Sequence, residues 1–61
     1  MKVTLKSARI NASYGQSEVA KRLGVSPATV VAWEKGRVSP RYNQLKELCN
    51  IYNIEITDLK L

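Results

Sequence analysis

Residues 16–35 have the sequence QSEVAKRLGVSPATVVAWEK, and this stretch decides the fold of the chain. Gly24 lies near its middle and can adopt the left-handed conformation that ends a helix without a Cβ clash. Ser26 and Pro27 then form a strong helix start. The serine hydroxyl accepts from a free backbone N–H, and proline at the first helical position loses nothing by lacking its own. The stretch therefore predicts two short helices joined by a tight turn, over residues 16–23 and 27–35.

The apolar residues of these two helices fall on faces that can pack together. In the first helix Val19 and Leu23 are four residues apart, and in the second Val30 and Trp33 are three apart, so each pair shares one helical face. Ala20 is small where the second helix must cross closely. We expect a fixed angle between the helices, maintained by the apolar set Val19, Ala20, Leu23, Val25, Val30 and Trp33.

Further helices are predicted on both sides of this pair. Thr4 can cap a first helix over residues 5–13, on which Ile10 must find cover outside the main apolar side. Ser39-Pro40 repeats the serine-proline start and predicts that a fourth helix begins there. The apolar stripe of that helix has the spacing i, i+3, i+4, i+7 and consists of Leu45, Leu48, Cys49 and Tyr52.

The end of the chain carries two more signals. Asn53 can end the fourth helix in the left-handed region, and Thr57 can cap a last turn. With 61 residues there is room for one domain and one modest core. We therefore predict an all-α fold, a compact bundle of four to five helices that forms a single domain over residues 1–61.

The central stretch resembles the helix-turn-helix of the phage-repressor (Cro/Xre-type) family. All seven positions of that pattern match, with apolar residues at five, a small residue at Ala20 and glycine at Gly24. The flanks match as well, with Gln16 opening the first helix, Glu34-Lys35-Gly36 after the second and Pro40 shortly beyond. The resemblance covers about residues 5–59. It implies a lambda-repressor-like domain that inserts helix 27–35 into the major groove of double-stranded DNA and acts as a transcriptional repressor or a switch protein of a phage or mobile element.

Composition agrees with a polyanionic partner. Ten Lys or Arg residues against five acids give a net charge of +5. The chain has no histidine and one cysteine, Cys49, so we expect no metal, no cofactor and no enzymatic activity. It has neither a membrane-spanning apolar run nor a signal-peptide pattern, which predicts a cytoplasmic protein. No small-molecule ligand can be inferred.

The residues that face the bases follow from the helical period. If Val30 and Trp33 point to the core, then at roughly 100° per residue the outward side carries small and apolar residues. We expect the base-facing set to be Pro27, Ala28, Thr29, Val31 and Ala32. It holds no Arg, Asn or Gln for bidentate bonds, so direct readout should be modest and favour thymine methyls. Alternatively, Ala28 and Ala32 do not contact bases and are surface residues that favour helix formation.

Phosphate contacts are expected around both ends of this helix. The family role of Gln16 is to bond the DNA backbone and steady the recognition helix, and the N-terminus of its own helix favours anions. The further candidates are hydroxyls and cations near the motif, namely Ser17, Ser26, Lys35, Arg37 and Arg41. Capping alone would explain Ser26, and each cation taken singly could be a solvated surface charge.

Glu34 lies close to this basic group and needs a partner. The family commonly pairs the positions of Arg9 and Glu34 in a partly buried salt bridge. The resemblance therefore implies that Arg9 ties the first helix to the end of the recognition helix and does not contact DNA.

A repressor of this kind would bind an inverted-repeat operator as a homodimer, with half-sites about one helical turn apart. The candidate dimer contacts are Ile54, Ile56, Leu59 and Leu61, although the same residues could instead close the core. A second function remains open, in which an antitoxin-like or adaptor protein uses the outer face of Val31 and Ala32 to meet a protein partner.

Overall fold

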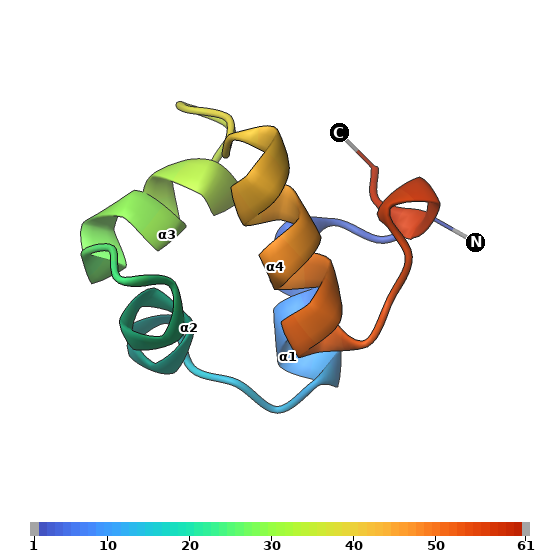
Figure 1. Cartoon of the computed structure of the whole chain (residues 1–61), viewed down its shortest axis with the longest axis horizontal. Helices are drawn as coiled ribbons and strands as arrows, with labels where there is room; N and C mark the ends of the chain where they lie inside the picture. The colour runs from blue at the N-terminus through green and yellow to red at the C-terminus, as the bar shows by residue number, and fades with distance from the viewer. Residues whose placement is uncertain (1, 61) are drawn as a thin grey trace.

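The computed structural model describes residues 2–60, and this part of the chain forms four α-helices and one short 3₁₀ turn (Figure 1). The prediction of an all-α fold is confirmed. The helices enclose the core between them, with α2 and α3 on one side of the molecule and η1 on the other. The elements are α1 (Leu5–Asn11), α2 (Gln16–Leu23), α3 (Pro27–Glu34), α4 (Tyr42–Tyr52) and η1 (Ile56–Asp58).

Apolar side chains from all the α-helices meet in one core. Val19 of α2, Val30 of α3 and Leu48 of α4 are the largest side chains that are fully buried, so the centre of the core lies where these three helices meet. The predicted stripe of α4 is buried in full. The remaining core residues are Leu5, Ala8, Ala20, Trp33, Leu45, Cys49, Tyr52 and Leu59. Ile10 finds no cover within the described residues and remains 56% exposed.

Side chains cap the starts of α1, α2 and α3, and the caps by Thr4 and Ser26 were predicted from the sequence. Thr4 accepts from the Ser7 N–H before α1, and Ser26 accepts from the Thr29 N–H before α3. Before α2, the Gly15 N–H donates to the Glu18 carboxylate at 3.1 Å. These bonds satisfy backbone donors that a helix start leaves free.

Each of the four α-helices within residues 2–60 is followed, within two residues of its end, by a residue with positive φ. These residues are Ser13, Gly24, Gly36 and Asn53, with φ between 55° and 75°. In each case the next residue donates its N–H to a carbonyl five residues back, as from Val25 to Ala20 at 3.0 Å. This Schellman pattern satisfies the last carbonyls and turns the chain sharply.

Three predicted boundaries were wrong, and α3 ends at Glu34, one residue before its predicted end at Lys35. α1 ends at Asn11 rather than residue 13, because Ser13 takes the left-handed conformation. α4 does not begin at Ser39-Pro40, because the Gln44 side chain accepts from the Arg41 N–H at 2.8 Å and starts the helix at Tyr42.

The third wrong boundary concerns the last turn. Thr57 lies inside η1 and does not cap it, because the Asp58 carboxylate accepts from the Glu55 N–H at 3.0 Å. Glu55 therefore begins the turn, two residues earlier than predicted.

Val3 pairs with Leu59 in an isolated parallel bridge, which joins the two ends of the described chain. The Val3 N–H donates to the Asp58 carbonyl and the Lys60 N–H donates to the Val3 carbonyl, both at 2.7 Å. This end of the molecule lies opposite α3 (Figure 1). None of the helices within residues 2–60 has the length and apolar character needed to cross a membrane.

Candidate nucleic-acid interface

α2 and α3 pack closely against each other and form a corner at the turn between them. Val19 and Ala20 on α2 and Val30 on α3 are each at most 1% exposed, so the two helices meet without a gap. Gly24, at φ 70°, turns the chain between them, and Val25 packs against the core beneath the turn. The outer side of α3 is therefore presented at a fixed angle.

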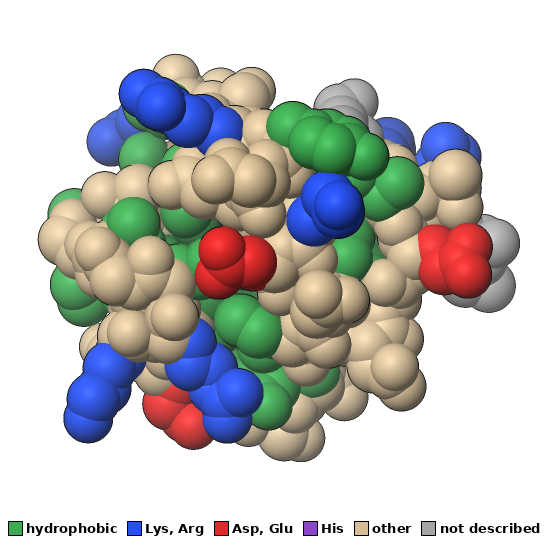
Figure 2. Space-filling view, in the orientation of Figure 1, with side chains coloured by type: hydrophobic (Ala, Val, Ile, Leu, Met, Phe, Trp, Pro, Cys, Tyr) green, Lys and Arg blue, Asp and Glu red, His purple; other side chains and the backbone are tan. Residues whose placement is uncertain are grey.

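The residues expected to face the bases differ in exposure. Pro27 and Ala28 are exposed, and Thr29, Val31 and Ala32 are half-buried. Figure 2 shows this region as a mixture of apolar and uncharged side chains over α3, at the left edge of the view. Trp33 is only 6% exposed and belongs to the core, so its ring is not available for stacking on bases.

Two hydroxyls stand together at the start of α3. The Ser26 hydroxyl oxygen accepts from the Thr29 N–H at 3.3 Å, and the two hydroxyl oxygens are 3.1 Å apart. Ser26 thus serves as helix cap and as partner of the Thr29 side chain at once. The sequence signalled the cap but not the contact between the two hydroxyls.

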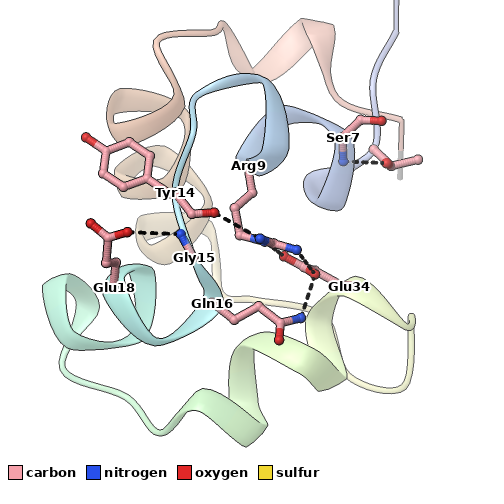
Figure 3. Close-up of polar contacts among 8 residues, drawn as sticks. Ser7, Arg9, Tyr14, Gly15, Gln16, Glu18 and Glu34 are labelled. Carbon is pink, nitrogen blue, oxygen red and sulfur yellow. Dashed lines mark hydrogen bonds and ion pairs between the residues drawn. The ribbon is translucent and has the colours of Figure 1, made fainter.

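Arg9 and Glu34 form the ion pair that the family resemblance implies (Figure 3). Arg9 Nε donates to Glu34 Oε2 at 2.7 Å and Nη2 donates to Oε1 at 3.3 Å. The side chains are 11% and 5% exposed, respectively. A third bond runs from Arg9 Nη1 to the Tyr14 carbonyl at 2.9 Å, so Arg9 holds the loop before α2 as well as the end of α3. The hydrogen bond to Glu34 raises the pKa of Arg9, which keeps the guanidinium charged.

Gln16 joins this ion pair, which the sequence did not predict. Its side-chain amide donates to Glu34 Oε1 at 3.0 Å, so Gln16 and Arg9 both point at the same carboxylate (Figure 3). One N–H of the amide is used in this way, and the second N–H and the carbonyl oxygen make no hydrogen bond to other residues that the structure describes. No local pattern indicates this contact, because 18 residues separate Gln16 from Glu34.

Cations and one further hydroxyl lie near the ends of α2 and α3. Lys35, Arg37 and Arg41 follow α3 and are exposed, and Ser17 is exposed in the first turn of α2. Figure 2 shows Lys and Arg side chains above the loop between α3 and α4, at the upper left.

The expected dimer contacts do not share one environment. Leu59 is only 3% exposed and packs in the core beside the bridge to Val3, so for this residue the structure fits the alternative that it closes the core. Ile54 and Ile56 are half-buried and line a groove together with Tyr42, which is 68% exposed. Leu61 lies outside the described residues.

Most of the chain can be aligned with known proteins. Residues 5–59 match the model of a helix-turn-helix family of the Cro/C1 type. The chain is 33% identical over 55 residues to the Vibrio cholerae cryptic phage CTXphi transcriptional repressor RstR, an alignment that covers 90% of this chain and 50% of the repressor. It therefore spans half the length of that relative. No solved structure matches this chain.

Two archaeal relatives align over more of their length. The chain is 34% identical over 59 residues to the HTH-type transcriptional regulator MJ0272 of Methanocaldococcus jannaschii, covering 97% of this chain and 89% of that protein. It is 32% identical over 59 residues to an HTH-type transcriptional regulator of Archaeoglobus fulgidus, covering 97% and 83%. Proteins of the matched family bind double-stranded DNA. The chain belongs to the Cro/C1-type helix-turn-helix family of transcriptional regulators.

Proposed function

We propose that this chain is a sequence-specific transcriptional repressor, or a switch protein of a phage or mobile element, that inserts α3 into the major groove of DNA in the cytoplasm. Residues 1–61 act as one DNA-binding domain. The observation that carries the proposal is the fixed presentation of α3. Its core face is buried through Val30 and Trp33, and its end is tied to α1 and α2 by the bonds of Arg9 and Gln16 to Glu34.

The outer face of α3 then meets the base edges. Ala28, Val31 and Ala32 offer methyl groups, which suit the methyl of thymine, and Thr29 offers one hydroxyl. Pro27 lies at the end of the helix that enters the groove first. Because these side chains form no bidentate bonds, DNA shape contributes a large part of the specificity.

Phosphates on either side of the groove meet the polar groups around α3. Gln16 uses its free amide N–H, and Ser17 and Ser26 use their hydroxyls. Lys35, Arg37 and Arg41 supply exposed positive charges just after α3. Binding therefore releases several counterions and weakens steeply as salt rises.

Binding to an inverted repeat requires two copies related by two-fold symmetry. Ile54 and Ile56 remain our candidates for this contact, with exposed Tyr42 beside them in the same groove. Tyr42 is an aromatic side chain of the kind enriched in interfaces.

One observation favours a second function. The apolar character of Val31 and Ala32 on the outer face would also suit a protein partner in an antitoxin-like or adaptor role. The two functions differ in salt dependence, because only a duplex partner releases condensed counterions on binding.

The test is selection of bound sequences from a random duplex pool at about 150 mM salt. An Ala28→Arg, Ala32→Glu variant alters the side of α3 that we expect to face the bases. A Lys6→Ala variant serves as the control, because Lys6 is exposed on α1. We expect a two-fold-symmetric site that the control keeps and the double variant loses. Binding that is blind to sequence in all three proteins would refute the proposed function.

A further inference from the structure

We propose that the hydroxyls of Ser26 and Thr29 form a directional relay that makes Thr29 an acceptor-only contact, selective for a base that carries a major-groove amino group, adenine or cytosine. This inference rests on the proposed function and names a base preference within it. The observation that carries it is the 3.1 Å separation of the two hydroxyl oxygens, together with the Thr29 N–H bond to Ser26.

The direction of the relay follows from counting hydrogens. A serine or threonine hydroxyl has one hydrogen to donate and two lone pairs to accept with. Phosphate oxygens only accept, so Ser26 placed against the DNA backbone must give its hydrogen to the phosphate. Its two lone pairs then face the Thr29 N–H and the Thr29 hydroxyl. Both groups are within reach in this structure, so the Ser26 oxygen is fully satisfied.

The Thr29 hydroxyl therefore donates its hydrogen bond to the Ser26 hydroxyl oxygen. What it presents to the outside are lone pairs, which can accept a bond but cannot donate one. In the major groove the N6 amino group of adenine and the N4 amino group of cytosine donate, whereas guanine O6 and N7 and thymine O4 accept. An acceptor-only Thr29 attracts the first pair of bases and repels the lone pairs of the second.

Without the phosphate contact the relay has no fixed direction. Ser26 can then donate to Thr29, and Thr29 can donate outward to guanine or thymine as readily as it accepts. Ser26 is thus a positioning residue for the specificity of Thr29. This role is separable from its role as helix cap, because a cap affects only the stability of α3.

The experiment compares bound-sequence selection by the native protein and by three variants. Thr29→Val keeps the shape and the backbone N–H but removes the hydroxyl. Ser26→Gly removes the serine oxygen, and glycine still starts a helix well. Ser17→Ala is the matched control, since it removes an exposed hydroxyl that we assign to phosphate alone.

We expect the native protein to select adenine or cytosine at one position of each half-site, by about threefold to tenfold, the range of one net hydrogen bond. Thr29→Val should lose the preference at that position and retain all others. Ser26→Gly should admit guanine or thymine there. Ser17→Ala should weaken binding evenly without changing any preference. If Thr29→Val does not fold, Thr29→Ala removes the same hydroxyl and favours the helix.

Two results would overturn the relay while leaving the proposed function intact. In one, a site is enriched but Thr29→Val changes no position of it. In the other, Ser26→Gly leaves the preference at the Thr29 position unchanged. If the native protein enriches no site at all, the proposed function fails, and the assignment of Thr29 fails with it.

Discussion

The Arg9–Glu34 ion pair provides a quantitative test of how this small domain is held together. In an Arg9→Met variant the Glu34 carboxylate, which is 5% exposed, keeps only the Gln16 amide as a partner among residues 2–60. Leaving one charge of a buried pair without its partner costs about 3–5 kcal/mol. At roughly 0.05–0.15 kcal/mol per residue, a chain of 61 residues has a free energy of unfolding on the order of 3–9 kcal/mol. We therefore expect Arg9→Met to lose at least about a third of that free energy of unfolding at 25 °C.

The assay is urea denaturation followed by circular dichroism, on a cycle of four proteins. These are the native chain, Arg9→Met, Glu34→Leu and the double variant. The double variant removes both charges and should lie within about 2 kcal/mol of the native protein, because replacing a buried ion pair by apolar groups is often neutral. Lys21→Met removes an exposed cation on α2 and should stay within about 0.5 kcal/mol.

Two outcomes would refute the reasoning. The first is an Arg9→Met variant whose free energy of unfolding is within about 1 kcal/mol of that of the native protein, which would mean that the pair is solvated rather than buried. The second is a double variant no more stable than Arg9→Met, which would mean that Arg9 acts mainly through its bond to the Tyr14 carbonyl.

Two further predictions concern the core and the turn. Burial, and then the nearby charge of Glu34, raise the pKa of Tyr52 to about 12. The stability this contributes is present below the unfolded pKa near 10 and is lost as the pH rises toward 12, by about 2–3 kcal/mol, so a Tyr52→Phe variant should lose less stability over that range in urea titrations. In the turn, Gly24→Ala should lower the free energy of unfolding by about 1 kcal/mol, because φ is 70° while the space for a Cβ is open. Gly24→Asn should lower it less, as Asn53 tolerates the same conformation, and equal losses for the two would contradict this explanation.

The motif was predictable because its signals are local and agree with one another. Gly24 ends α2, and Ser26-Pro27 starts α3, each through bonds to residues within five positions. The start of α4 was predicted wrongly, since Ser39-Pro40 carries a local helix-start signal and Arg41 does not. In the structure the bond from the Arg41 N–H to Gln44 starts the helix at Tyr42.

The contacts that hold the site together are of a different kind. The bond from Gln16 to Glu34 depends on the angle between α2 and α3, which comes from packing and not from a local pattern. The burial of Leu59 likewise depends on Val3, at the other end of the chain. The sequence therefore showed an apolar residue near the end of the chain, but it did not show whether Leu59 packs in the core or lies on the surface.

The bridge between Val3 and Leu59 makes the described chain almost a ring. Its two hydrogen bonds join residues more than fifty positions apart, at the side of the molecule away from α3 (Figure 1). A short linker between the ends should therefore be accommodated without strain, and the chain could be opened instead in an exposed loop such as residues 37–39. A circular permutant of this kind would keep the α2–α3 corner intact and change only the order of the helices along the chain.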